Sequence, residues 1–126
     1  MNTPVPVFYF AHPVGAPDAA GVAANLAAAR RWFARLLDLC PDVALVASWL
    51  PYLDVLEDSG DNRRRGLRDD LEVVRRCDGI VLCGTHVSTG MALELAEVRS
   101  LHPRGIGTRG DVIDLIGVDI DNLGEI

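Results

Sequence analysis

Lysine is absent from this sequence, and all 12 of its basic residues are arginines. Without lysine, the chain can form neither a Walker A phosphate loop nor a Schiff base. Its 18 acidic residues give a net charge of −6, so it lacks the broad positive field that attracts polymeric nucleic acid. A small anionic ligand is still compatible with this charge, because helix N-termini bind anions locally.

Long apolar runs are also missing. No stretch approaches the roughly 20 residues that a membrane-spanning helix needs. Residues 1–6 lack the basic region and apolar run of a signal peptide. We therefore expect a cytoplasmic protein with no membrane partner. The length of 126 residues is that of one globular domain, expected to span 1–126.

Cysteine is scarce, and Cys40, Cys77 and Cys83 form no C-x-x-C pair. An odd number of cysteines at wide spacing argues against a disulfide framework or a zinc site, so buried thiols in a reducing compartment are expected. His12 and His86 have no Cys or Asp partner at metal-ligand spacing. We expect neither a metal nor a cofactor.

Short apolar segments alternate with amphipathic ones along the chain. The expected strands are 5–11, 43–47, 79–83 and 111–118, and the expected helices are 20–39, 66–77 and 91–101. Segment 48–65, which contains Pro51 and Gly60, is expected to be a long excursion with one helical turn around 52–56. This order predicts an α/β domain with a parallel sheet and helices on both faces.

Ligands of parallel sheets bind beyond the carboxyl ends of the strands. Loops 12–15, 48–52 and 84–90 each follow an expected strand, so we expect them to surround one cleft. His12 and Trp49 lie in these loops. His12 can bind phosphate or act as an acid. Trp49 can stack on a base or simply pack in the core.

Asp70 lies on the apolar face of its expected helix. It is three residues after Leu67 and four before Val74, whereas Asp69 points to the opposite side. A buried carboxylate without a partner is costly, so Asp70 needs a partner or a function. The alternative is that Asp70 lies in the first turn of the helix, where negative charge is favoured and water can reach it.

Glu94 repeats this pattern on the next expected helix. Met91 and Val98 define the inner face of that helix, and Glu94 falls on the same face without a charged neighbour in sequence. Ser88 or Thr89 can cap the helix, or the same hydroxyl and the backbone N–H groups can hold a phosphate or a sugar hydroxyl. Gly90 would let a ligand approach the backbone closely.

Residues 70–78 (DLEVVRRCD) and 88–95 (STGMALEL), with Tyr9 in the opening strand, resemble the nucleoside 2-deoxyribosyltransferase superfamily. This superfamily includes the 2′-deoxynucleoside 5′-phosphate N-hydrolases. The resemblance covers 9–101. It implies a flavodoxin-like or Rossmann-like three-layer sandwich with a mostly parallel sheet of four to five strands. It also implies a small-molecule nucleoside or nucleotide as ligand, and a homodimer or higher homo-oligomer.

The resemblance also implies a role for each site residue. Glu94 would be the nucleophile that attacks the anomeric carbon, and Asp70 would protonate the leaving base or activate the acceptor. Tyr9 would orient Glu94, while Ser88 and the N–H groups near Gly90 would hold the 5′-phosphate or 5′-hydroxyl. Water as the acceptor gives hydrolysis, and a second base gives transfer.

The sequence also departs from the family pattern. His12 and Pro13 stand where characterised members commonly have glycine-containing loops, and Ala96 stands where they often have glycine. These differences leave open a non-catalytic nucleotide-binding or sensing module, or a structural subunit with the same fold. The identity of the base and of the sugar, and the role of segment 49–65, are open as well.

Two further signals receive little weight. Residues 105–110 read G-x-G-x-x-G, but a dinucleotide-binding loop requires a strand before it and a helix after it, so a flexible turn is expected. The arginine run 63–65 is typical of a solvated surface, although it would reach a nucleotide if segment 48–65 folds over the cleft.

Overall fold

The computed structural model describes residues 4–101 and 111–122, and within them it has four strands and four α-helices. The strands are β1 (Val7–Ala11), β2 (Ala44–Val46), β3 (Gly79–Leu82) and β4 (Asp111–Asp114). The helices are α1 (Ala19–Leu39), α2 (Trp49–Val55), α3 (Gly60–Arg75) and α4 (Thr89–Leu101), and a 3-10 turn, η1, spans Ile120–Asn122. All strand pairings are parallel, in the order β2-β1-β3-β4, which confirms the expected α/β three-layer fold.

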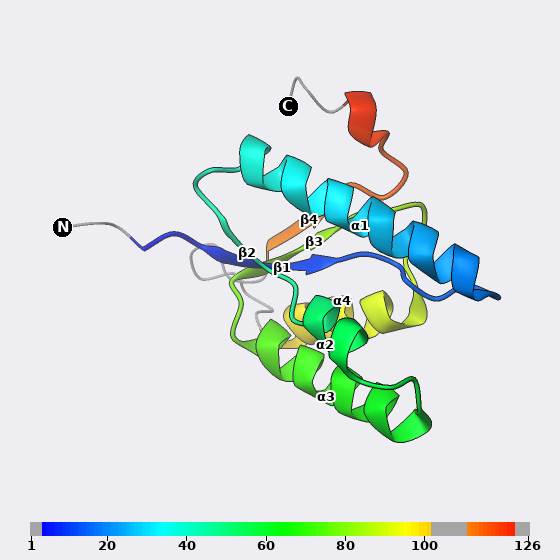
Figure 1. Cartoon of the computed structure of the whole chain (residues 1–126). Coiled ribbons are helices and arrows are strands. Elements are labelled where there is room, and N and C mark those ends of the chain that lie inside the picture. Colours follow the sequence, from blue (N-terminus) through cyan, green and yellow to red (C-terminus); the bar gives the residue numbers. More distant parts are fainter. Residues whose placement is uncertain (1–3, 102–110, 123–126) are drawn as a thin grey trace.

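The helices cover both faces of the sheet (Figure 1). Helix α1 lies on one face, and α3 and α4 lie on the other, with α2 beside α3. The chain passes from β1 outward to β2, then returns past β1 to β3 and β4. The direction of winding therefore changes between β1 and β3, and such a switch point opens a crevice at the carboxyl edge of the sheet.

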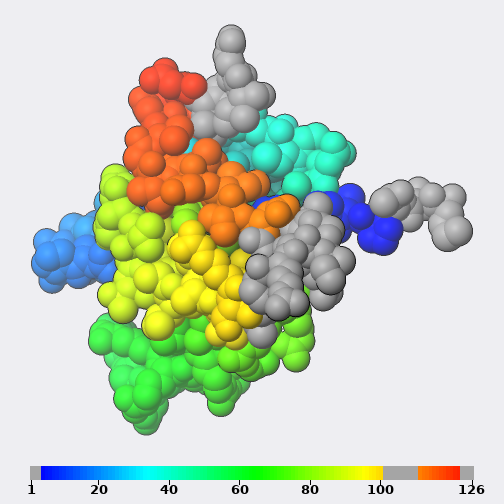
Figure 2. Space-filling view, turned by 180° about the vertical axis from the view of Figure 1, so that it is seen from behind, coloured from blue at the N-terminus to red at the C-terminus, as the bar shows by residue number. Residues whose placement is uncertain are grey.

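Seen from behind, α4 (yellow) lies at the surface between β4 (orange) and the green region formed by α2 and α3 (Figure 2). Its exposed side includes Leu93, and Val87 is exposed just before the helix. Within residues 4–101 and 111–122, no helix has both the length and the hydropathy needed to cross a membrane.

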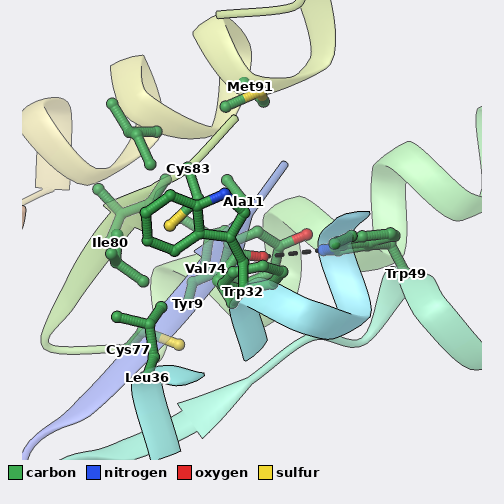
Figure 3. Packing of buried hydrophobic residues seen from close by; sticks show 14 of the residues in the cluster. Tyr9, Ala11, Trp32, Leu36, Trp49, Val74, Cys77, Ile80, Cys83 and Met91 are labelled. Carbon is green, nitrogen blue, oxygen red and sulfur yellow. Dashed lines mark hydrogen bonds between the residues drawn. The ribbon is translucent and has the colours of Figure 1, made fainter. Parts of the chain in front are cut away.

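The core is built around the two central strands, β1 and β3. Their side chains pack against Trp32 and Leu36 of α1, Val74 of α3 and Met91 of α4 (Figure 3). Tyr9 and Phe10 are fully buried in β1, as is Ile80 in β3. All three cysteines are free thiols: Cys77 and Cys83 are buried and Cys40 is half-buried.

Segment 48–65 differs most from the sequence expectation. The expected helical turn around 52–56 is confirmed as part of α2, which begins at Trp49. The expected length of the excursion is wrong, because α3 begins at Gly60, six residues before the expected start at 66. Ser59 caps α3 by accepting a hydrogen bond from the Asn62 N–H at 3.1 Å. The first turns of α3 are exposed and polar, so they carry no apolar periodicity that would reveal a helix.

Other boundaries shift by fewer residues. Strand β4 ends at Asp114 rather than at 118, because the chain turns through Gly117, whose φ of +79° breaks an extended strand. The G-x-G-x-x-G run at 105–110 lies outside the described residues.

Candidate active site at the carboxyl edge of the sheet

A cavity of about 730 Å³ lies at the predicted cleft. This volume falls within the range of small-molecule sites, about 300–1,000 Å³. The predicted site residues that line it are His12, Trp49, Asp70, Ser88, Gly90 and Glu94. Tyr9 and Thr89 are not in its wall: Tyr9 is fully buried, whereas Thr89 is exposed at the start of α4.

Glu94 faces inward from α4, with 6% of its surface exposed. Burial raises its pKa to about 8, and the negative charge of Asp70 acts in the same direction. The Tyr9 hydroxyl opposes this rise by stabilising the ionised form of Glu94. The inward orientation expected from helix periodicity is therefore observed.

Asp70 is also buried, with 9% exposed, and it accepts a hydrogen bond from the Ser48 hydroxyl at 2.8 Å. Burial raises its pKa to about 6, although the Ser48 hydrogen bond lowers it. The first-turn alternative is wrong for Asp70, because α3 begins ten residues earlier, at Gly60. Asp69 points away from the core, where it accepts a hydrogen bond from Tyr52 at 2.7 Å and pairs with Arg68.

Ser48 is a site residue that sequence reasoning missed. It follows the last apolar residues of the β2 segment, at the carboxyl edge of the sheet, and that position was the available signal. A serine directly after a strand has many common roles, so the sequence could not identify Asp70, 22 positions further along, as its partner.

Tyr9 lies behind the two carboxyl groups. Its hydroxyl interacts with Glu94 and Ser48, and burial followed by the charges of Glu94 and Asp70 raises its pKa. Neither contact has the geometry of a regular hydrogen bond. Among the described residues, this hydroxyl is the only fully buried side-chain N or O atom without one. Catalytic hydrogen bonds are often loosely aligned in proteins without ligand, so this geometry is compatible with an orienting role.

The start of α4 forms another part of the wall. Ser88 caps the helix, because its hydroxyl oxygen accepts a hydrogen bond from the Met91 N–H at 3.3 Å. A Cβ atom built at Gly90 would meet no protein atom within 4 Å, so the backbone there is open to a ligand. Of the two alternatives for the Ser88 hydroxyl, capping is the one observed.

Trp49 and His12 form the wall near the end of β1. The Trp49 indole N–H donates to the Phe10 carbonyl at 2.8 Å, a bond drawn as a dashed line in Figure 3, and its ring stacks on Phe10 at 6.1 Å. Trp49 therefore packs in the core while its edge borders the cavity. His12 is 7% exposed, and its ring stacks on the Phe10 ring at a centroid distance of 6.3 Å.

Segment 49–65 forms the outer wall of the cavity through α2 and the first turn of α3. Its apolar side chains include Tyr52, Leu53 and Leu56. Arg63 also borders the cavity and forms two hydrogen bonds with Asp58, at 2.6 and 2.8 Å. The other two arginines of the run 63–65 are exposed and do not line the cavity.

No group of three or more His, Cys, Asp or Glu side chains in the described part of the chain is arranged to hold a metal ion. His86 is exposed, and its Nδ1 lies 3.0 Å from the Thr85 hydroxyl.

The fold and the site define a class of protein: a parallel α/β domain with two buried carboxyl groups in a cavity at the carboxyl edge of its sheet. Residues 11–104 match the family described as Domain of unknown function (DUF7768), and the chain belongs to this family. The matched span contains Asp70 and Glu94 and begins two residues after Tyr9. A comparison with curated proteins gives no match.

Proposed function

We propose that this protein binds a nucleoside or nucleotide and cleaves its N-glycosidic bond, with Glu94 as nucleophile and Asp70 as acid and base. The observation that carries the proposal is that both carboxyl groups are buried, have raised pKa values and line one cavity. Perturbed carboxyl groups in a cleft are characteristic of catalytic sites. The ligand is a small molecule rather than polymeric nucleic acid, and we propose a cytoplasmic homo-oligomer.

The proton content of the pair supports this chemistry. With pKa values of about 8 for Glu94 and about 6 for Asp70, the two groups together carry one proton and one negative charge between these pH values. A retaining glycosidase needs this combination, because one carboxylate attacks the sugar while a second group donates a proton to the leaving group.

In the free protein the proton resides on Glu94, the group with the higher pKa. Positive charge that develops at the anomeric carbon favours ionised Glu94, and the Tyr9 hydroxyl stabilises the same form. The proton then resides on Asp70. As an oxygen of Glu94 forms a bond to the anomeric carbon, the C–N bond breaks and the base nitrogen takes the proton from Asp70.

The second step regenerates the protein. A water molecule attacks the anomeric carbon of the glycosyl ester, Asp70 accepts its proton, and the Glu94 carboxylate leaves. The nitrogen of a second base in place of water gives transfer instead of hydrolysis. Ser88 and the open backbone at Gly90 would surround the 5′ end of the ligand, whereas Thr89 lies outside the cavity wall.

Base release tests the proposal. Ribo- and 2′-deoxyribonucleosides and their 5′-monophosphates are incubated with protein, and free base is measured by chromatography. We expect release by the wild type and a loss of at least about a thousandfold in Glu94→Gln. Asp69→Asn is the matched control for Asp70→Asn, because Asp69 is the adjacent carboxylate but faces away from the cavity. No release from any compound by the wild type contradicts the proposal.

A covalent trap tests the roles of the two carboxyl groups. A nucleoside with fluorine at the 2 position of the sugar slows both steps, and the slower hydrolysis lets the glycosyl ester accumulate. Peptide mass spectrometry should then find the sugar on Glu94. A sugar attached to Asp70 would reverse the two roles while leaving the reaction class intact.

A non-catalytic nucleotide sensor is the second candidate. It is favoured by the raised pKa of Glu94, because a neutral carboxyl group donates a hydrogen bond to a ligand rather than attacking it. Micromolar binding of a nucleotide without base release would support this candidate over the enzyme.

A further inference from the structure

The cavity has two chemically different sides, as strand β1 shows. The Phe10 ring meets Phe33 of α1 edge-on at 5.4 Å, so Phe10 faces α1, and His12, two residues on, stacks on Phe10. Tyr9 points to the opposite face, toward Glu94. The carboxyl groups therefore lie on the α4 side, and His12 lies on the α1 side.

The α1 side of the cavity is mostly apolar. Val14 from the loop after β1, and Val22 and Leu26 from α1, line it, and their side chains carry no hydrogen-bonding groups. His12 is the polar side chain on this side. A ligand whose sugar lies at Glu94 would extend its base toward this surface.

The protein fixes the tautomer of His12. Its Nδ1 lies 2.7 Å from the Pro13 carbonyl oxygen, which can only accept, so Nδ1 carries a hydrogen. Burial lowers the pKa of His12, which favours the neutral ring. In a neutral ring with hydrogen on Nδ1, the other nitrogen, Nε2, is an acceptor.

Nε2 has no hydrogen-bond partner among the described residues, yet it is not sealed in the core. Among the described residues, the only fully buried side-chain nitrogen or oxygen atom that lacks a hydrogen bond is the Tyr9 hydroxyl oxygen, so Nε2 is not one of these buried atoms. A ligand in the cavity that His12 lines can approach its ring, in which Nε2 is the acceptor. A bound ligand that supplies no donor would shield this acceptor from water and leave it unpaired, which weakens binding.

The loop after β3 leaves room for this arrangement. Gly84 has a φ of +110°, and a Cβ atom there would lie 2.7 Å from Pro13 Cδ and 3.2 Å from His12 Nε2. Only glycine fits both the conformation and the space. The position of the His12 ring is thus set by two loops, one after each central strand.

We propose that His12 is a specificity-determining residue whose Nε2 accepts a hydrogen bond from an amino or imino group of the leaving base. This inference rests on the proposed function, and it adds that the cavity selects nucleosides by a donor on the base. A base without the donor leaves Nε2 unpaired in a largely apolar surface, which corresponds to about 10- to 100-fold weaker binding.

Two matched pairs of ligands test the inference. Deoxyadenosine is compared with purine deoxyriboside, and deoxyguanosine with deoxyinosine, because the members of each pair differ by an exocyclic amino group. Equilibrium dissociation constants are measured by calorimetry, and base release is measured in parallel. We expect the wild type to prefer the amino-bearing member of at least one pair by about 10- to 100-fold.

Variants of His12 show whether this residue causes the preference. His12→Phe keeps a ring beside Phe10 but has no acceptor. The ratio of the two dissociation constants within the preferred ligand pair should therefore fall to about one. His12→Gln can place a carbonyl oxygen near the position of Nε2 and should restore part of the ratio. A general loss of packing would weaken both members equally, so it leaves the ratio unchanged. If His12→Phe does not fold, His12→Leu serves for the same comparison.

The outcomes separate the two proposals. Cleavage or binding with equal preference within both pairs, or a preference that persists in the variants without an acceptor, overturns the role of His12 and leaves the proposed function standing. If the wild type neither binds nor cleaves any of the four nucleosides, the inference fails. The proposed function fails as well only if the wider panel of ribo- and 2′-deoxyribonucleosides and their 5′-monophosphates also releases no base.

Discussion

Replacing Glu94 by Gln should stabilise the protein at high pH and should have much less effect at low pH. Glutamine keeps the shape of the side chain but cannot ionise. Burial raises the pKa of folded Glu94 from its ordinary value of 4.5 to about 8. At pH values between 4.5 and about 8, Glu94 is therefore protonated in the folded protein but ionised in the unfolded chain. The free energy of unfolding of the wild type therefore falls as the pH rises through this window, and it levels off above pH 8.

The expected size follows from the same two values. Each pH unit between folded and unfolded pKa values is worth about 1.4 kcal/mol, so the span from 4.5 to about 8 corresponds to about 5 kcal/mol. Water that enters the cavity when Glu94 ionises reduces this cost. The free energy of unfolding of Glu94→Gln, measured relative to the wild type, should be about 2–5 kcal/mol higher at pH 8.5 than at pH 4.5. This is a large part of a typical domain stability of about 5–15 kcal/mol.

Urea unfolding of both proteins at pH 4.5 and pH 8.5 measures the difference. Asp70 contributes its own pH dependence to both proteins, because burial raises its pKa from 3.8 to about 6. At each pH, the unfolding free energy of the wild type is therefore subtracted from that of Glu94→Gln. The two differences, at pH 4.5 and at pH 8.5, are then compared. Glu57→Gln is the control, because it removes an exposed carboxylate. A difference between wild type and Glu94→Gln that varies by less than about 1 kcal/mol between the two pH values would refute the reasoning.

Three other substitutions test neighbouring contacts. Ser48→Ala removes the 2.8 Å hydrogen bond that lowers the pKa of Asp70, so that pKa should rise further, as carbon-detected NMR titration would record; an unchanged value would contradict the assignment. Gly84→Ala places a Cβ atom 2.7 Å from Pro13 Cδ at a φ of +110°, and we expect a loss of about 2 kcal/mol or more; an unchanged melting temperature counts against this strain. Trp49→Phe leaves a buried carbonyl of β1 without its donor, so denaturant unfolding should show a loss of about 1–3 kcal/mol, and a neutral result would mean that water replaces the indole.

The sheet and most helices could be predicted because their apolar residues recur with the periods of buried elements. The runs that became β1 and β3 are nearly continuous and apolar, as expected for strands covered on both faces. Segment 48–65 could not be predicted by this means. Pro51 lies in the first turn of α2, where a helix tolerates proline, and the start of α3 depends on the cap at Ser59.

The two carboxyl groups could be predicted because each lies on the apolar face of its own helix. That inference needs only local spacing. The contacts between elements could not be predicted in this way: the Ser48 hydroxyl reaches Asp70 from another segment, and the Tyr9 hydroxyl reaches Glu94 from the sheet. The orientation of the His12 ring also depends on the Pro13 carbonyl, which only coordinates reveal.

The cost of the buried carboxyl groups is itself an argument for function. Apolar side chains of similar size at positions 70 and 94 would serve packing without desolvating two acids. The structure instead gives each acid a hydroxyl neighbour, Ser48 for Asp70 and Tyr9 for Glu94, and each neighbour lowers the pKa without returning it to its ordinary value. These contacts keep both charged forms accessible near neutral pH, although each costs more than it would in water, and in the free protein only one of the two acids is ionised between about pH 6 and pH 8. A ligand that develops positive charge between the two carboxyl groups removes that penalty at the moment when the charge appears. Stabilisation of this kind favours a transition state over a ground state, which is what an active site requires.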